Sequence, residues 1–459
     1  MAVRDAQRYH FSGIAGAGMN PLARLMKAWG HDVQGSDRSL DQGQQAAVAE
    51  QLRALGIRVV PQDGAAVVAG IDRFVYSTAV ESATPEVIRA RELGIARVPR
   101  PALLAEVVDQ GGPGVAISGT SGKSTVTGML AWIVRAAGID ATVLGGAALA
   151  GEDGGGCFRA GARGAAVVAE ACESDGTLIG YHPGIGVLHN ISRDHAEMDA
   201  LEKQFAAFAG NCATLLVNAG SPAAMALGAR ARRVRTYGLG DAAQLRVEPL
   251  AAGPHHAEGV LRDGGDACAL RLRQPGMHNL ENAAAAAAAA RELGVPLAAI
   301  ADALATFPGV ARRFEVVGVS DGGIRVVDDY AHNVEKIRAT IAAAQAGCER
   351  LVAVFQPHGF GPARFLRPEL KLELPGMLRA QDRFCYAEIF YAGGTVQMDI
   401  SSRMLADDLP PALRCGYAKD HAAVLSWVAD EARPGDTVLL MGARDPRLAA
   451  LARAVAGIL

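Results

Sequence analysis

The chain has 459 residues and a mass of 47.5 kDa, and at about 150 residues per domain this length predicts about three domains. Hydrophobic residues make up 50% and charged residues 20% of the sequence, which is enough apolar material for several cores and excludes an intrinsically disordered protein. The formal net charge of −3 argues against binding of nucleic acid through a broad basic surface.

The seven cysteines are scattered and include no Cys-x-x-Cys pair, a pattern that fits a reducing compartment and neither a disulfide framework nor a zinc ribbon. The N-terminal residues lack a hydrophobic signal core, and the longest apolar run, Ala283–Ala290, is far shorter than a membrane span. We therefore expect a cytoplasmic protein with small-molecule substrates, no nucleic-acid partner and no membrane insertion. The sequence leaves the oligomeric state open.

Short β-type runs alternate with amphipathic helical patterns, which predicts α/β domains with largely parallel sheets. Helices are expected over Pro21–Gly30 and Thr125–Ala137, and a few antiparallel strands over Leu245–Arg273. In chain order, the other expected strands are Tyr9–Ser12, Phe74–Ser77, Gly114–Ser118, Ala165–Ala169, Ile185–His189, Ile324–Val327, Leu351–Phe355 and Thr437–Leu440. Glycine- and proline-rich breaks near residues 111–114 and 307–309 predict domains over 1–108, 109–309 and 310–459.

The first domain carries a glycine-rich turn, Gly13–Gly18, directly after its first strand, and Gly35-Ser36-Asp37 follows the next strand. Glycines before a helix and an acid about twenty residues later are typical of a diphosphate bound at a helix N-terminus. Pro21 stands where a third glycine of the NAD fingerprint is wanted. Plain glycine turns, or an NAD-dependent dehydrogenase, therefore remain alternatives here.

The strongest single motif is Gly119-Thr120-Ser121-Gly122-Lys123-Ser124-Thr125, placed between an expected strand and an expected helix. Glycines let the backbone wrap a phosphate, the lysine neutralises β- and γ-oxygens, and the following hydroxyl can hold Mg²⁺. Lys123 is one of only six lysines among 45 basic residues, which makes a chance lysine at this place harder to accept. Ile117 replaces the first glycine of the general pattern, so a plain glycine turn is the alternative.

Two further strand ends carry Glu170 and, after Asn190, the pair Asp194-His195. Carboxylate and hydroxyl oxygens are suitable Mg²⁺ ligands, and Glu170 with Ser124 predicts such a site. An imidazole is a less usual Mg²⁺ ligand, so a surface Asp-His pair is the alternative reading of His195.

Taken together, these segments resemble the Mur ligases, the ATP-dependent amide-forming enzymes of peptidoglycan assembly. The similarity runs through nearly the whole chain and is strongest in an ordered set of motifs. These are His10–Met19 with Gly35–Asp37, Ser77–Val80 followed by Pro85-Glu86, Gly119–Ser124, Glu170 and His195, Gly276–Asn282, Arg312–Glu315, and Asp328–His332.

The resemblance implies three α/β domains: a Rossmann-like UDP-sugar domain, a central P-loop ATPase domain and a C-terminal Rossmann-like domain. It implies ATP and Mg²⁺ as cofactors, with Ser124, Glu170 and His195 as metal ligands. The implied catalytic residues are Lys123, Glu170, His195, Arg313, Asp329 and His332. ATP contacts are implied for Gly119, Thr120, Gly122, Lys123, Ser124, Thr125, His278, Asn279, Asn282, Arg313 and Asp329. Substrate contacts are implied for Gly16, Ala17, Gly18, Met19, Ser36, Asp37, Ser77, Thr78, Tyr330, His332 and His358.

The resemblance further implies an activity, the joining of UDP-N-acetylmuramate or a close analogue to an amino acid, L-alanine first, through an acyl phosphate. One departure concerns the amine: after Gln356-Pro357-His358, Gly359 and Pro362 replace the arginines that grip the amino-acid carboxylate. Arg364 and Arg367 are candidates to supply a guanidinium from a shifted position. The alternatives are a recycling ligase that attaches a short peptide, a related ligase with another amine, and an inactive nucleotide-binding protein.

Overall fold

The computed structural model describes residues 6–77, 80–110, 112–152, 157–173, 176–191, 198–391 and 397–459. The chain divides into two compact units: unit 1 holds residues 1–251, 257–273 and 277–308, and unit 2 holds the remainder, chiefly 309–459. Three sheets with mainly parallel strands confirm the predicted α/β class. The domain boundaries at 108 and 309 stay predictions.

The N-terminal sheet is parallel, with strand order β3-β2-β1-β4-β5. Its strands are β1 (Arg8–Ser12), β2 (Asp32–Ser36), β3 (Arg58–Val59), β4 (Arg73–Tyr76) and β5 (Ala96–Pro99), and its helices α1 (Met19–Ala28), α2 (Arg38–Asp41), α3 (Ala46–Ala54), α4 (Pro85–Glu92) and α5 (Arg100–Gln110). Because the strand order reverses at β1, the loop that follows it opens at the point where such sheets bind ligands.

The second sheet of unit 1 has ten strands in the order β15-β14-β13-β12-β11-β10-β6-β9-β7-β8. The strands are β6 (Gly114–Ser118), β7 (Ala141–Leu144), β8 (Phe158–Arg159), β9 (Ala166–Glu170), β10 (Ile185–Leu188), β11 (Thr214–Asn218), β12 (Val234–Leu239), β13 (Leu245–Ala252), β14 (Ala257–Asp263) and β15 (Asp266–Leu272). The segment that predicted antiparallel strands forms β13 to β15. As expected, β14 and β15 are antiparallel, and β13 joins this group to the large sheet by pairing parallel to β12.

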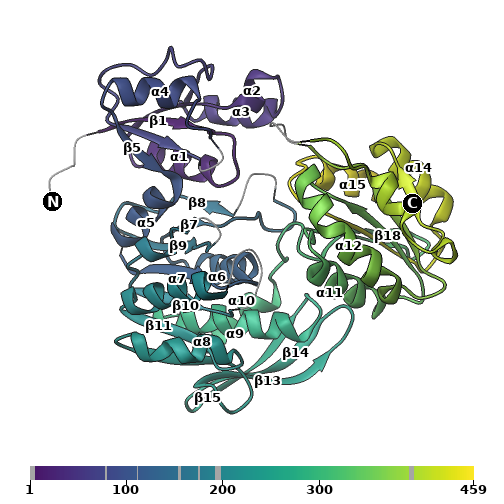
Figure 1. The fold of residues 1–459 in the computed structure, drawn as a ribbon. Helices are drawn as coiled ribbons and strands as arrows, with labels where there is room; N and C mark the ends of the chain where they lie inside the picture. The colour runs from purple at the N-terminus through teal and green to yellow at the C-terminus, as the bar shows by residue number, and fades with distance from the viewer. Residues whose placement is uncertain are drawn as a thin grey trace. The chain divides into compact units, whose positions relative to one another are not determined.

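Helices cover this sheet: α6 (Lys123–Ala136), α7 (Met198–Asn211), α8 (Pro222–Leu227), α9 (Met277–Glu292) and α10 (Leu297–Ala305). The alanine tract lies in α9, where all eight alanines are buried and α9 packs against α6 and α10 (Figure 1). Small side chains allow this close approach of helices, so the tract is a packing surface as well as a strong helix former.

Unit 2 is built on a six-stranded sheet in the order β16-β17-β21-β18-β19-β20. Its strands are β16 (Glu315–Val319), β17 (Arg325–Asp329), β18 (Leu351–Gln356), β19 (Arg383–Ala387), β20 (Gly416–Ala418) and β21 (Thr437–Gly442). Only β16 is antiparallel to its neighbour.

Two apolar layers sandwich this sheet, because strand side chains alternate between its faces. One layer packs under α11 (Val334–Gln345), α12 (Phe360–Met377) and α13 (Ser402–Asp407), the other under α14 (His421–Glu431) and α15 (Leu448–Ile458). Figure 1 shows α11, α12, α14 and α15 around β18. In the part of the chain that the structure describes, no helix combines the length and apolarity needed to cross a membrane.

Candidate active site

The phosphate-loop motif lies between β6, all of whose residues are buried, and the first turn of α6. Gly119 has a φ of 140° and Gly122 a φ of 83°, conformations that favour glycine. A Cβ atom on Gly122 would lie 2.6 Å from Asn282 Oδ1 and 2.8 Å from the His189 ring. The two glycines are therefore required both by backbone conformation and by close approach, and the loop fits a backbone cradle for phosphate.

Lys123 is buried under this loop beside a glutamate. Its ammonium donates hydrogen bonds to the Gly119 carbonyl at 2.6 Å and to the two carboxylate oxygens of Glu173 at 2.8 and 3.1 Å. Burial alone would lower the pKa of Lys123, but the Glu173 carboxylate outweighs it and raises that pKa above its ordinary value. The lysine is therefore held charged at the place where a phosphate group would bind.

The oxygens expected to bind Mg²⁺ lie together. Ser124 Oγ is 3.2 Å from Glu170 Oε1, and Glu170 Oε2 accepts a hydrogen bond from the Gly146 amide at 3.0 Å. One hydroxyl and one carboxylate beside a phosphate cradle fit a hard cation that keeps several waters. His195, the third expected ligand, lies outside the described residues.

Two polar residues that directly follow β10, His189 and Asn190, lie beside the loop. The Asn190 side chain accepts from the Ser121 amide at 2.8 Å and donates to the Ser121 carbonyl at 3.2 Å. His189 bonds the Tyr237 hydroxyl at 2.9 Å through Nδ1, and burial lowers the pKa of His189. The neutral imidazole thus packs beneath Gly122 without adding a positive charge.

The expected nucleotide-contacting residues of α9 form a chain beside this loop. Asn282 donates to Asn279 Oδ1 at 3.2 Å, and Asn279 Nδ2 lies 3.2 Å from Nε2 of the exposed His278. Asn282 Oδ1 is buried without a hydrogen-bond partner among the described residues. The structure thus brings these α9 residues and the phosphate loop together within unit 1.

In the N-terminal domain, Ser36 is fully buried, and its hydroxyl donates to Glu86 Oε2 at 2.7 Å. Ser12 donates to the same oxygen at 2.7 Å, and His10 Nε2 lies 2.8 Å from Glu86 Oε1. The Ser36 side chain therefore stabilises a buried carboxylate, so any contact with substrate would come from its backbone.

Asp37 stabilises the glycine-rich turn after β1. Its carboxylate accepts from the Ala15 amide at 3.0 Å and from the Ser39 amide at 2.9 Å. The backbone at Gly16, Ala17 and Gly18 is exposed before α1, whereas the Met19 side chain is buried in the core. Ser77 ends the neighbouring strand region at intermediate burial, and Thr78 lies outside the described residues.

In unit 2, Arg312 ties two strand ends together. Its guanidinium donates to Asp328 Oδ2 at 3.2 Å and to the Gly442 carbonyl at 2.6 Å. Burial raises the pKa of Asp328 to about 6 despite this arginine. Arg313 is exposed, with its guanidinium 5.1 Å from the centre of the Tyr330 ring, so it is the more available of the two for a ligand.

The other residues expected in this region follow β17 and β18. Asp329 accepts from the amides of Phe314 and Ala331 at 2.7 and 2.8 Å and from the Thr340 hydroxyl at 3.1 Å, so its carboxylate shapes the turn. The His332 ring lies 5.4 Å from the Tyr330 ring and 5.5 Å from the His358 ring, centre to centre. The structure therefore brings Tyr330, His332 and His358 into one aromatic cluster.

Some of the site's neighbours escaped the sequence-based expectations. Glu173 lies three residues after Glu170 in the sequence, and this short spacing between two acids was the available signal. Pro85-Glu86 is one of the motifs of the resemblance, but the bond of Glu86 to Ser36, 50 residues away in the sequence, had no local signal. The contact of His189 with Tyr237, 48 residues away, had none either.

Comparisons with known proteins agree with this geometry. Three family models match in order: the Mur ligase family catalytic domain over residues 8–111, the Mur ligase middle domain over 117–290 and the Mur ligase glutamate ligase domain over 312–444. The UDP-N-acetylmuramate–L-alanine ligase of Kineococcus radiotolerans is 37% identical over 456 residues, covering 95% of this chain and 93% of the relative.

Two solved structures share the fold. The UDP-N-acetylmuramate–alanine ligase of Thermotoga maritima has a TM-score of 0.77 and 25% identity, covering 98% of both chains. A murein peptide ligase of Psychrobacter arcticus has a TM-score of 0.70 and 22% identity, covering 99% of this chain and 100% of the other. By sequence and by fold, the chain belongs to the Mur ligase family of ATP-dependent amide-bond-forming enzymes.

Proposed function

We propose that the protein joins UDP-N-acetylmuramate to L-alanine in an ATP- and Mg²⁺-dependent reaction. The observation that carries the proposal is the phosphate loop, in which Lys123 bonds the Gly119 carbonyl and Ser124 contacts Glu170. The chain is also similar over 95% of its length to a UDP-N-acetylmuramate–L-alanine ligase. All seven cysteines are free thiols, which supports the cytoplasmic location that is part of the proposal.

ATP would supply the phosphoryl group that activates the substrate carboxylate as an acyl phosphate for attack by the amine. The protein's work is then positioning and charge neutralisation. Lys123 would neutralise phosphate oxygens. Ser124 and Glu170 would hold one Mg²⁺, and His195 would hold another. Asn279, Asn282 and His278 would contact the nucleotide beside the loop, and Arg313 and Asp329 would contact it from the C-terminal domain.

The turn after β1 would bind the UDP-sugar at Gly16, Ala17, Gly18 and Met19, with Asp37 holding the turn through the Ala15 amide. The cluster of Tyr330, His332 and His358 would face the amine. Domains at 1–108, 109–309 and 310–459 are part of this proposal, one each for the sugar nucleotide, ATP and the amine.

A second candidate is attachment of a short peptide, and the altered segment after His358 favours it. Gly359 and Pro362 stand where the arginine grip on an amino-acid carboxylate is expected, and the fold is shared with a murein peptide ligase. Affinity for free L-alanine is therefore the property that separates the two candidates.

The test is a coupled assay of ADP release with UDP-N-acetylmuramate, UDP-N-acetylglucosamine and free N-acetylmuramate as acids, each crossed with L-amino acids and short peptides. The proposal expects release only with UDP-N-acetylmuramate and an amine together, with L-alanine the preferred amine. Release that needs a peptide would favour the second candidate. No release with any pair would overturn both.

A further inference from the structure

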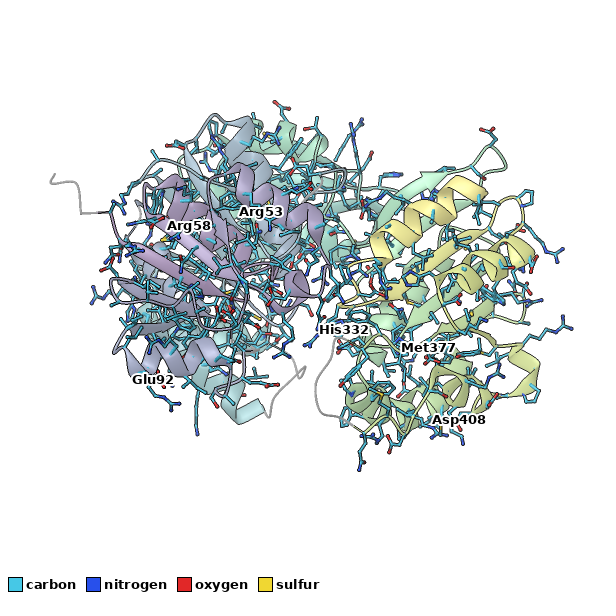
Figure 2. All side chains as sticks on the ribbon, turned by 90° about the horizontal axis from the view of Figure 1, so that it is seen from above. Arg53, Arg58, Glu92, His332, Met377 and Asp408 are labelled. Carbon is cyan, nitrogen blue, oxygen red and sulfur yellow. The ribbon has the colours of Figure 1, made fainter. Side chains whose placement is uncertain are left out.

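The two arginines expected to replace the missing carboxylate grip are already paired within the protein. The Arg364 guanidinium bonds Asp399 and the carbonyl of Gln397 at 3.3 Å. Arg367 makes a two-point ion pair with Asp408, at 2.6 and 3.1 Å. Figure 2 shows Asp408 well apart from His332 in this unit, so the Arg367 charge is neutralised away from the aromatic cluster.

Position 359 itself cannot easily carry an arginine. Gly359 has φ 72° and ψ 140°, a combination that residues with a Cβ atom rarely adopt. A Cβ atom there would also lie 3.3 Å from Pro362 Cδ. Position 359 is therefore committed to glycine, and a positive charge for the substrate has to be sought elsewhere in unit 2.

Arg444 is placed to supply that charge. In the parallel sheet β21 lies between β17 and β18, and Gly442 pairs with Gln356 in register. Arg444 comes two residues after Gly442, and His358 comes two residues after Gln356. Both residues therefore lie just beyond the carboxyl ends of two adjacent strands. On the other side of β21, Met441 pairs with Asp329, so the chain leading to Tyr330 and His332 leaves the sheet at the same edge.

The loop that presents Arg444 is firmly held. Asp445 is fully buried and accepts from the Arg447 amide at 2.9 Å and from the Arg447 guanidinium at 3.0 Å. Two residues before Arg444, the Gly442 carbonyl accepts from Arg312, whose guanidinium also lies 5.2 Å from the Tyr330 ring centre. These contacts fix the direction in which the chain passes through position 444.

Arg444 itself is exposed and has a φ of 64°, a left-handed conformation that a residue with a side chain adopts at a cost. Within the described part of unit 2, its guanidinium has no acidic partner, unlike those of Arg364, Arg367 and Arg447. Arg444 thus carries a positive charge without an acidic partner among the described residues of unit 2, in a strained backbone conformation. It lies at the carboxyl ends of the strands, where the aromatic cluster of Tyr330, His332 and His358 also lies.

We propose that Arg444 binds the α-carboxylate of the amino-acid substrate and so determines the preference for a free amino acid. The inference rests on the proposed function and deepens it by naming the group that takes the place of the lost arginine grip. A guanidinium suits this task because its planar N–H groups match a carboxylate and stay charged.

The experiment measures KM for L-alanine, L-alaninamide, ATP and UDP-N-acetylmuramate in the wild type and in Arg444→Gly. Glycine relieves the left-handed backbone, so the variant is expected to fold, and a thermal melt checks this. Arg414→Gly is the matched control, because Arg414 is exposed and also left-handed, at φ 47°. Arg414 precedes β20, so it lies at the amino ends of the parallel strands, whereas Arg444 lies at their carboxyl ends.

We expect Arg444→Gly to raise KM for L-alanine by about 10- to 100-fold, the loss typical of one charge-assisted hydrogen-bonded pair. KM for ATP and for UDP-N-acetylmuramate should change less than about twofold, and the preference of the wild type for L-alanine over L-alaninamide should disappear. Arg414→Gly should retain that preference.

Equal KM values for L-alanine in the two variants would overturn the role of Arg444 while the ligase function stands. A wild type that uses L-alanine and L-alaninamide equally well, or that accepts peptides and not L-alanine, would likewise overturn it with the ligase function intact. A wild type that releases no ADP with any amine would overturn the proposed function and this inference together.

Discussion

Both carboxylate oxygens of Glu173 lie within hydrogen-bonding distance of the Lys123 ammonium, at 2.8 and 3.1 Å, and both side chains are buried. The pair keeps the phosphate-loop lysine charged, and each partner needs the other because an unpaired buried charge is costly. Removal of the lysine therefore affects both catalysis and folding stability, and the two effects must be measured separately.

Lys123→Ala should abolish ADP formation, because the positive charge facing the phosphates is lost. It should also lower the free energy of unfolding by about 3 kcal/mol, since Glu173 is left buried and unpaired. ADP release and chemical denaturation measure the two effects. The double variant with Glu173→Gln should recover stability without activity, and the exposed Lys203→Ala serves as control. Near-normal turnover of Lys123→Ala would contradict the mechanism.

Glu170→Gln should raise the Mg²⁺ concentration needed for half-maximal ADP release by about tenfold or more, because a ligand charge is removed while its shape is kept. A titration of Mg²⁺ at saturating ATP measures this. Glu152→Gln changes an exposed acid that pairs with Arg135 and should leave the titration unchanged. An unaltered Mg²⁺ requirement in Glu170→Gln would place the metal elsewhere.

Ser36→Ala should lower the free energy of unfolding by about 1.5–3 kcal/mol, because it removes a hydrogen bond to the buried Glu86 carboxylate. Denaturant unfolding measures the loss, and the exposed Ser82→Ala is the control. If Ser36→Ala weakened only the binding of UDP-N-acetylmuramate and left stability unchanged, its hydroxyl would be a substrate contact after all.

Stability should depend on pH through Asp328, whose pKa burial raises to about 6 from an ordinary value of 3.8. The native state then holds the proton more tightly than the unfolded chain, so this group's contribution falls as pH rises from about 4 to about 6. The upper limit is about 3 kcal/mol for a shift of about two units.

Unfolding of the wild type and Asp328→Asn at several pH values measures this dependence. The stability of the wild type minus that of the variant should decrease over that range, because asparagine cannot ionise. A difference that stays constant with pH, or that increases, would contradict the assignment.

Much of the fold and part of the site followed from local sequence. The expected strand Gly114–Ser118 is β6 residue for residue, and the expected helix Thr125–Ala137 lies within two residues of α6 at either end. The contact of Ser124 with Glu170 was also foreseen, because both residues follow strands whose carboxyl ends share one edge of a parallel sheet.

The sequence by itself determined the Mur ligase family. The reason is that its glycine-rich loops and strand ends are short continuous motifs, which can be read from the order of the residues alone. Only the tertiary structure decided which charges are available to ligands. The Ser36 hydroxyl bonds Glu86, 50 residues away, and Arg364 and Arg367 are paired with acids 35 and 41 residues away. The physical reason is that a charged or polar side chain bonds whichever partner the packing of distant strands and loops brings within about 3 Å, and local spacing does not specify that partner.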